Sequence, residues 1–360
     1  MSILPLKPHS KSRVEQQELQ HIYVRYSPLA IAAVFFIIAV VSIPIGIVVI
    51  VCGDRTSHVS FRYDDVNNYT FVMGSAGQYA VDFDFNGTSF STGAVARVDF
   101  TLHKSLSAPI YIEYVLDPFY QNYRWFAASV DSSQLRGGTR RLSKFCHPYR
   151  YPGEKTGEDI SGYYNPCGAF PWSMYNDSIS LYKRDATLIC DGGKFNTDGT
   201  SQIPNNHCKK KGIALKEDVE SSYKAPKSMS GHGPMWKAGG DSTATDPYQK
   251  AGYYYREPGH KIPSSLDEDV MVWLKMAFVN RVTKTYRIVE VDLPAGDYYF
   301  EVLEQFATAP ISGRKYIRLA TRSWIGEKNH VLGILLIVVG GVGFVLAIAL
   351  FILQCFIAPG

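Results

Sequence analysis

Residues 29–51 read LAIAAVFFIIAVVSIPIGIVVIV, residues 331–357 read VLGILLIVVGGVGFVLAIALFILQCFI, and neither stretch contains a charged side chain. Each is longer than the roughly 20 apolar residues that a helix needs to cross the hydrocarbon of a bilayer. A cleaved signal sequence is an alternative for the first stretch, but 28 residues precede it and no small-residue cleavage site stands out after it. The sequence therefore predicts a membrane protein with two transmembrane helices.

The two predicted helices divide the rest of the chain into two short tails and one large domain. The tails are residues 1–28 and 358–360, and the domain comprises residues 52–330. Basic residues before the first helix favour cytosolic tails. Basic residues of the large domain just before the second helix favour the opposite orientation, so the charge rule does not decide the topology. The formal net charge of +4 gives no indication of a nucleic-acid partner.

Sequons and cysteines place the large domain outside the cytosol. Three sequons for N-glycosylation lie in it, beginning at Asn68, Asn86 and Asn176. Four of the six cysteines also lie in it, and an even set of cysteines at short separations indicates two disulfides in an oxidising compartment. We therefore expect an extracytoplasmic, glycosylated domain and cytosolic termini.

The pairing of these cysteines is not decided by their spacing. Cys146, Cys167, Cys190 and Cys208 allow three connectivities, of which the sequential one closes the shortest loops. A zinc site is the competing interpretation, but there is no Cys-x-x-Cys pair and the nearest histidines directly adjoin cysteines. The remaining two cysteines, Cys52 and Cys355, lie at membrane ends, where a free thiol or a palmitoylated one is equally compatible with the sequence.

Alternating apolar residues predict an α+β domain built on antiparallel sheet. Residues 98–102 and 110–114 alternate as half-buried strands do, and residues 286–291 and 298–303 flank a Pro/Gly turn that predicts a hairpin. Residues 315–319 could add a further strand. One helix is expected over residues 119–128, with Asp117 and Pro118 as its cap and first turn. A second is expected after a capping box between Ser265 and Glu268, with an apolar face formed by Val270, Trp273, Leu274, Ala277 and Phe278. Residues 217–262 show no periodicity and predict a long loop, exposed towards a partner or disordered.

The sequence contains no recognisable catalytic, cofactor or metal motif. Nucleophile elbows, zinc-protease helices and phosphate-binding loops are all missing from it. Asp267, Glu268 and Asp269 could be imagined as an acid/base set, but carboxylates at the start of a helix are explained by its dipole. We therefore expect neither catalysis nor a cofactor.

The predicted transmembrane helices carry packing features rather than transport features. Small residues on the second helix share one face and predict close contact with another helix; they are Gly333, Gly340, Gly343 and Ala347. Pro44 and Gly46 predict a kink in the first helix. Because neither helix has a charged group that could line a pathway, we interpret both as docking elements.

Several motifs occur in an order that resembles one family. They are SIPIG (42–46), FYQNYR (119–124), NPCG (165–168), SMYND (173–177), KKKGIA (209–214), WLK (273–275), LPAG (293–296) and SWIG (323–326). This series is similar to the cell-division-cycle-protein-fifty, or ligand-effect-modulator-three, family, and the similarity runs from about the first predicted span through the second.

The resemblance implies a function that the residues alone do not. Members of this family are non-catalytic β-subunits of type-four P-type ATPases, the flippases that move phospholipids from the outer or lumenal leaflet to the cytosolic one. Such a subunit forms a heterodimer with its α-subunit and supports folding, export from the endoplasmic reticulum and the transport cycle. The implied location is the endoplasmic reticulum, the Golgi or endosomal membranes, or the plasma membrane.

The resemblance also bears on the cysteines. Cys146 and Cys167 match a bonded pair of the family, and Cys190 and Cys208 look like a pair particular to this branch. Many members carry further cysteines between the first span and the FYQNYR motif, whereas residues 53–145 contain none.

Alternative functions are a subunit of a two-span ligand-gated channel, which would need a polar pore-lining stripe, and a two-pass cell-surface receptor.

Overall fold

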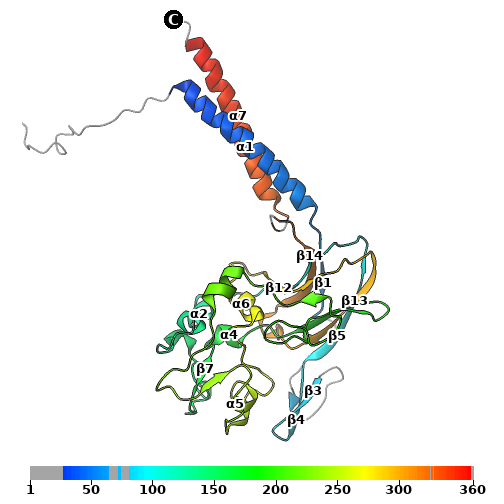
Figure 1. Cartoon of the computed structure of the whole chain (residues 1–360), viewed down its shortest axis with the longest axis vertical. Coiled ribbons are helices and arrows are strands. Elements are labelled where there is room, and N and C mark those ends of the chain that lie inside the picture. The colour runs from blue at the N-terminus through cyan, green and yellow to red at the C-terminus, as the bar shows by residue number, and fades with distance from the viewer. Residues whose placement is uncertain (1–26, 65–71, 74–80, 325, 327, 358–360) are drawn as a thin grey trace, which may run out of the picture. The chain divides into compact units, whose positions relative to one another are not determined.

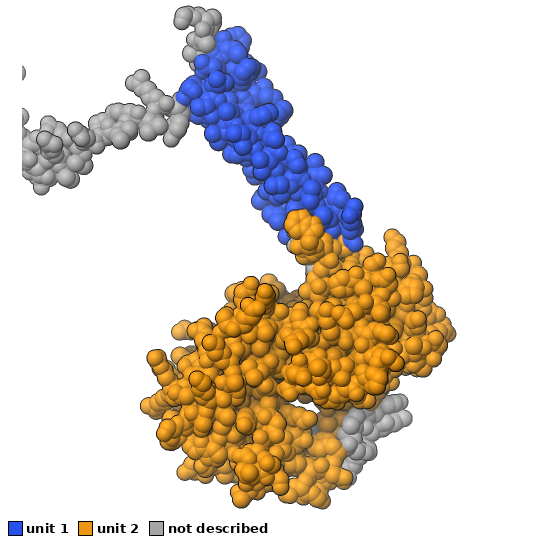
Figure 2. Space-filling view, viewed as in Figure 1, with its two compact units in different colours: residues 1–55, 328–360 blue, residues 56–327 orange. Residues whose placement is uncertain are grey.

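The computed structural model describes residues 27–64, 72–73, 81–324, 326 and 328–357. The chain forms two compact units, which are distinguished by colour in Figure 2. The first unit comprises residues 1–55 and 328–360, and the second comprises residues 56–327.

The first unit is a pair of long apolar helices. Helix α1 spans Pro28–Asp54 and helix α7 spans His330–Ile357, and they lie side by side in Figure 1. Ser27 caps α1, because its side-chain oxygen accepts a hydrogen bond from the backbone N–H of Ala30 at 3.1 Å. Both helices are long and apolar enough to span a bilayer, with mean hydropathies of 3.2 and 3.0. The end of α1 is tied to the start of α7 by Asp54, whose carboxylate contacts Lys328 and His330 at 3.0 and 2.9 Å.

The second unit is built on two antiparallel sheets. A five-stranded sheet has the order β1 (His58–Arg62), β14 (Arg314–Thr321), β6 (Ile110–Asp117), β12 (Val282–Val289) and β10 (Cys208–Lys209). A four-stranded sheet has the order β5 (Ala94–Leu102), β13 (Gly296–Glu304), β8 (Ser178–Lys183) and β9 (Leu188–Asp191). Two apolar helices flanking an antiparallel, sheet-rich domain confirm the predicted fold class.

The two sheets share one hydrophobic core. Alternate residues of β5 and β13 point into it, including Phe100 and Phe300, and Ile112 and Leu319 enter it from the five-stranded sheet. The ring of Phe61 on β1 lies 4.3 Å from the ring of Phe100, so the aromatic contacts cross from one sheet to the other. Burial of such side chains supplies the main stabilisation of the domain, at about 25 cal/mol per Å² of apolar surface.

Shorter elements complete the domain. A three-stranded sheet contains β2 (Val72–Met73), β4 (Thr88–Thr92) and β3 (Val81–Phe85), and β7 (Tyr163–Asn165) pairs in parallel with β11 (Met235–Lys237). The short helices are α2 (Arg124–Ala128), α3 (Ser132–Leu135), α4 (Ala169–Trp172), α5 (Pro247–Ala251) and α6 (Glu268–Leu274). Single turns of 3-10 or π-helix lie at Lys144–Cys146, Asp218–Ser222 and Ala309–Ile311.

The predicted hairpin at residues 286–303 is wrong. Its strands exist as β12 and β13, but β12 pairs with β6, whereas β13 pairs with β5 and β8 in the other sheet. The connecting residues carry the chain between sheets. Leu293 forms a two-way backbone bridge with Leu106, at 2.8 and 2.9 Å, and its side chain is buried in the core.

The two predicted helices are shorter than expected. Residues before Tyr123 are not helical, because Asp117 is still part of β6 and the N–H of Phe119 donates to the carbonyl of Asn280 at 2.7 Å. Asp267 rather than Ser265 caps the later helix, since its carboxylate accepts from the N–H of Asp269. The carboxylate of Glu268 instead accepts hydrogen bonds from the backbone of a neighbouring loop, so the predicted capping box does not form.

The predicted long loop at residues 217–262 is folded. It contains β11 and α5 and contributes Met229, Trp236, Tyr254 and Ile262 to a second hydrophobic core. The prediction of an exposed or disordered excursion is therefore wrong. Its isolated aromatic residues are buried, but their irregular spacing gives no helix or strand period.

Candidate functional site

The small residues of α7 contact α1 of the same chain. A Cβ atom added at Gly340 would lie 2.6 Å from Cγ1 of Ile43, and one at Gly333 would lie 2.5 Å from Cγ1 of Ile50. Gly343 is less tightly packed, with the carbonyl oxygen of Phe35 at 3.2 Å from the added atom. These positions therefore permit the two helices to approach closely.

The first helix contributes small residues to the same contact. A Cβ added at Gly46 would lie 2.8 Å from the carbonyl oxygen of Gly333, and Ala39 of α1 and Ala347 of α7 are both buried. Pro44 lies inside α1, two residues before Gly46. Because each helix covers the small-residue face of the other, the exposed faces available to a further protein are the opposite ones, which carry large aliphatic and aromatic side chains.

An exposed apolar surface lies around α2 in the second unit. We call it the aromatic patch and define it by six residues whose exposed fractions run from 43% to 79%: Tyr120, Tyr123, Trp125, Phe145, Phe278 and Val279. Its parts are joined by contacts. The side-chain amide of Asn122 donates to the carbonyl of Phe278 at 2.9 Å, and the rings of Trp125 and Phe145 lie 6.3 Å apart.

Buried neighbours hold the aromatic patch in place. The side chain of Gln121 is fully buried; its oxygen accepts from the N–H of Ala277 at 3.0 Å and its amide donates to the carbonyl of Trp273 at 3.3 Å. Phe119 and Phe126 pack against the main core beneath. Residues 119–128 therefore place one set of side chains in the core and display the other set to solvent.

Cations border the aromatic patch. The guanidinium of Arg124 lies 5.6 Å from the ring of Trp125, and the ammonium of Lys144 lies 5.5 Å from the ring of Phe145. Aromatic residues together with arginine are the types enriched in protein–protein interfaces. Exposed apolar surface bordered by polar groups in this way is typical of a protein-binding site. The sequence indicated the patch only through the FYQNYR motif, which the family resemblance singled out.

Two of the three carboxylates at the start of α6, those of Asp267 and Asp269, belong to a buried ionic cluster, whereas the carboxylate of Glu268 accepts from the backbone of residues 212 and 214. Lys210 contacts Asp267 and Asp269 at 2.6 and 3.0 Å, and Arg287 contacts Asp269 at 2.7 Å. Burial and the neighbouring Asp269 raise the pKa of Asp267. Burial also acts to raise the pKa of Asp269, but Arg287 and Lys210 outweigh it, so the pKa lies below its usual value. The helix-dipole interpretation was incomplete, because these side chains neutralise two buried cations.

A cleft of about 620 Å³ borders this cluster and is lined by both acidic and basic side chains, including Asp177 and Lys261. A smaller cavity of about 200 Å³ lies among tyrosines in the second core, including Tyr149 and Tyr254. Within the described ranges, no three His, Cys, Asp or Glu side chains are placed to hold a metal ion. The carboxylates in the large cleft are paired with cations rather than arranged around a nucleophile.

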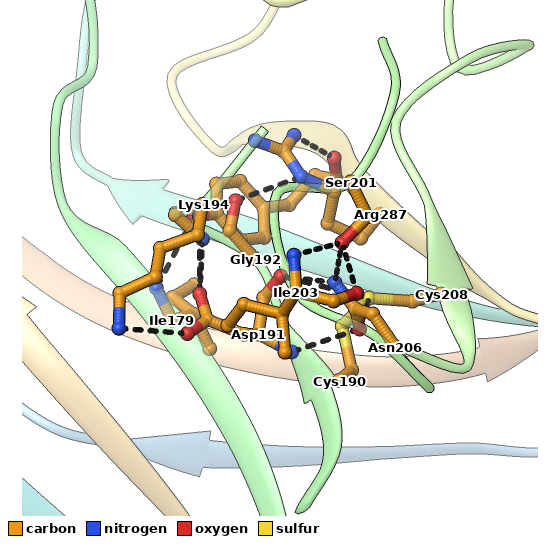
Figure 3. The surroundings of a disulfide bond; sticks show 12 residues. Ile179, Cys190, Asp191, Gly192, Lys194, Ser201, Ile203, Asn206, Cys208 and Arg287 are labelled. Carbon is orange, nitrogen blue, oxygen red and sulfur yellow. Dashed lines mark hydrogen bonds and ion pairs between the residues drawn. A yellow bond between two sulfur atoms is a disulfide. The ribbon is translucent and has the colours of Figure 1, made fainter. Parts of the chain in front are cut away.

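Two disulfides cross-link the second unit. Cys146 bonds to Cys167 and Cys190 bonds to Cys208, which is the sequential pairing. Cys190 lies in β9 and Cys208 in β10, so the second bond connects the four-stranded sheet to the five-stranded sheet. Figure 3 shows its surroundings. There Asn206 exchanges hydrogen bonds of 2.9 and 3.1 Å with the backbone of Asp191, and Arg287 donates to the carbonyl of Gly192 at 2.9 Å.

The first disulfide lies in the second core, where Cys146 and Cys167 are both fully buried. The remaining two thiols, Cys52 and Cys355, are free. Of the predicted glycosylation sites, Asn68 lies outside the described residues. Asn86 is exposed in the turn between β3 and β4, and Asn176 is exposed beside the large cleft, so both side chains are accessible.

Comparison with known proteins adds a near full-length relationship. Residues 47–359 match the LEM3 (ligand-effect modulator 3) family / CDC50 family. The chain is 29% identical over 329 residues to cell cycle control protein 50A of Mus musculus, covering 89% of this chain and 82% of the relative. It is 28% identical over 353 residues to ALA-interacting subunit 3 of Arabidopsis thaliana, covering 94% and 84%. Cell cycle control protein 50B of Homo sapiens is 28% identical over 261 residues, covering 69% and 68%.

Proposed function

The chain belongs to the LEM3/CDC50 family, and on that premise we propose that it is the non-catalytic β-subunit of a type-four P-type ATPase. In this role it forms a heterodimer with the α-subunit, supports its folding and its export from the endoplasmic reticulum, and is needed for movement of phospholipids to the cytosolic leaflet. The observation that carries the proposal is the family match over residues 47–359, which includes the second apolar helix, the last part of the first helix and the whole domain between them.

The relatives support an accessory role. Those from Arabidopsis thaliana are named as interacting subunits, which describes proteins that act by binding another protein. The buried ionic cluster at α6 fits this role, because its carboxylates neutralise Lys210 and Arg287 instead of facing a substrate. ATP hydrolysis and lipid translocation are accordingly assigned to the α-subunit.

We infer that the aromatic patch and the outward faces of α1 and α7 contact the α-subunit. Exposed aromatic side chains fixed from below lose little conformational freedom on binding, which favours their use as anchors. Contacts in the membrane and outside it reinforce one another, because the first contact raises the effective concentration of the second. Assembly then tolerates the weakening of either surface alone.

The topology follows from the same proposal. Both termini face the cytosol, residues 56–327 lie in the lumen or outside the cell, and Asn86 and Asn176 carry glycans. Glycosidase digestion should lower the apparent mass. Protease added to sealed vesicles from the cytosolic side should spare this domain, and its digestion would refute the topology.

Co-expression tests the function directly. We expect a flippase α-subunit to leave the endoplasmic reticulum and to transport fluorescent phospholipid only when this chain is present. Affinity purification from native membranes should recover a P-type ATPase as the companion chain. If every such ATPase of the cell reaches its membrane and transports lipid equally well without the chain, the assignment is wrong.

A pair of substitutions tests the aromatic patch. Phe278→Ala removes the most exposed ring of the patch and should weaken copurification with the α-subunit by about tenfold or more, as loss of an interface anchor does. Ile311→Ala shortens an exposed apolar side chain outside the patch and serves as the control. Equal losses in both variants would show that the patch is not the contact surface.

A further inference from the structure

Trp324 is the most exposed large apolar side chain among the residues that the structure describes, with 83% of its surface accessible. An indole has a large apolar surface, and leaving it in water forfeits the stabilisation that burial would bring. Neither the core of the domain nor the aromatic patch uses this side chain. Its exposure therefore points to an external partner.

A tight turn fixes the exposure of Trp324. The backbone N–H groups of Ser323 and Gly326 each donate to the carbonyl of the other residue at 2.9 Å, and the hydroxyl of Ser323 also contacts the carbonyl of Gly326 at 2.9 Å. Gly326 has φ = +104°, a conformation that favours glycine. These bonds hold the backbone on both sides of Trp324, whose indole is exposed.

The base of the turn is anchored to the five-stranded sheet. Thr321, the last residue of β14, donates its N–H to the carbonyl of Ser57 at 2.9 Å, and its hydroxyl accepts from the N–H of Ser57 at 2.9 Å. The guanidinium of the next residue, Arg322, lies 4.1 Å from the ring of Tyr111 and pairs with Glu113. Trp324 is therefore presented from a well-connected edge of the domain.

The length of chain between Trp324 and α7 limits how far the indole can lie from the start of that helix. Helix α7 begins at His330, so five residues lie between the two, and the six steps of fully extended chain from Trp324 to His330 span at most about 22 Å. This limit holds for any orientation of the domain relative to the helices. The interfacial layer of a bilayer begins where such a helix leaves the hydrocarbon and is several ångströms thick.

The chemistry of this segment fits that layer. Tryptophan is enriched at membrane–water interfaces because its ring is apolar and its N–H is polar. Exposed cations accompany it near the ends of the helices: Arg55, which suits a phospholipid phosphate, and Lys328, which also pairs with Asp54. We propose that Trp324 inserts into the interfacial layer of the phospholipid bilayer beside α7 and anchors the domain on that leaflet. This inference rests on the two-span topology and is independent of the proposed β-subunit role.

Fluorescence quenching of the full chain in lipid nanodiscs tests the proposal. The chain has five tryptophans, of which Trp125 is the other strongly exposed one and lies in the aromatic patch. Trp324→Phe removes the proposed anchor fluorophore, and Trp125→Phe is the matched control. Each protein is compared in phosphatidylcholine discs with and without brominated lipid, and with iodide added to the water.

We expect brominated lipid to quench the wild-type chain and the Trp125→Phe variant alike. Trp324→Phe should lose about half or more of that lipid-dependent quenching, since an interfacial tryptophan is the one within reach of the bromines. Lipid brominated near the head group should quench more strongly than lipid brominated near the chain ends. Unchanged lipid quenching in Trp324→Phe would overturn the proposal, as would iodide quenching that depends on Trp324 while lipid quenching does not.

Discussion

Replacement of Lys315 by methionine should destabilise the second unit, residues 56–327, strongly. Its side chain is 1% exposed, and its ammonium contacts Asp177 at 2.8 Å, Glu304 at 3.0 Å and the carbonyl of Phe306 at 3.0 Å. The hydroxyl of Tyr63 also donates to Asp177 at 2.8 Å. Because Lys315 lies on β14 and Glu304 on β13, the ion pair connects the two sheets of the core.

The expected magnitude follows from the charges left behind. Methionine fills a similar volume, but Asp177 and Glu304 lose their shared buried cation, and breaking a buried ion pair on one side costs about 3–5 kcal/mol. For a domain of this size about 2–4 °C is lost per kcal/mol, which predicts a fall of roughly 6–20 °C in the unfolding temperature. Lys209→Met is the matched control, because Lys209 pairs with Glu290 on the surface and such pairs contribute about 0–1 kcal/mol.

The loss should also depend on pH. Burial raises the pKa of Glu304 and Lys315 opposes that rise, so removing Lys315 raises the pKa further. A carboxyl group whose pKa is higher in the folded state than in the unfolded state lowers stability as the pH rises through the folded pKa. The deficit of Lys315→Met should therefore be largest near neutral pH and shrink on acidification.

Thermal unfolding of the full chain in detergent, followed by tryptophan fluorescence at several pH values, measures both effects. A shift in Lys315→Met no larger than that of Lys209→Met would refute the argument that the buried pair connects the sheets. So would a deficit that grows as the pH falls. Addition of Glu304→Gln to Lys315→Met should restore part of the stability, because it removes one of the two unpaired carboxylates.

Three further predictions concern other parts of the chain. Gly340→Leu should destabilise the helix pair by about 1–3 kcal/mol through overpacking. Gly341→Leu should have little effect, because no atom of another element lies within 4 Å of a Cβ added there. Unfolding in mixed micelles with a rising fraction of SDS compares the two variants. Burial lowers the pKa of Lys284 to about 8, so the unfolded chain binds a proton at this side chain more tightly than the folded chain does. The stability of the wild type should therefore rise between pH 7.5 and 9.5, whereas that of Lys284→Met should not. Cys146→Ser opens a loop with a sequence separation of 21 and should cost about 3 kcal/mol, and non-reducing peptide maps of the wild type should show Cys146 joined to Cys167 rather than to another cysteine.

Much of the architecture could be predicted from local sequence patterns. The two membrane helices follow from uninterrupted apolar stretches, whose length and composition are read without knowledge of any contact. The strands β5, β6, β12, β13 and β14 follow from alternating apolar residues. The motif series indicated the family, and the match over residues 47–359 confirms it.

The candidate site was less accessible to such reasoning. The motif at residues 119–124 drew attention to the right segment, but an exposed and a buried aromatic residue are identical in sequence. Tyr120 and Trp125 face solvent while Phe119 and Phe126 enter the core, a difference that depends on tertiary contacts such as the bonds of Gln121 to residues 273 and 277. The small-residue face of α7 likewise predicted a helix contact without identifying the helix.

The sequence by itself determined the elements whose signal is local: the apolar spans, the alternating strands and the positions of sequons and cysteines. The tertiary structure alone decided which elements meet. It placed β12 and β13 in different sheets, used Gly340 to pack α7 against α1, and paired Lys315 with Asp177 across 138 residues of chain. The physical reason is that periodicity reports only whether a side chain is buried, whereas strand partners, ion pairs and helix contacts depend on the free energy of the whole packed domain.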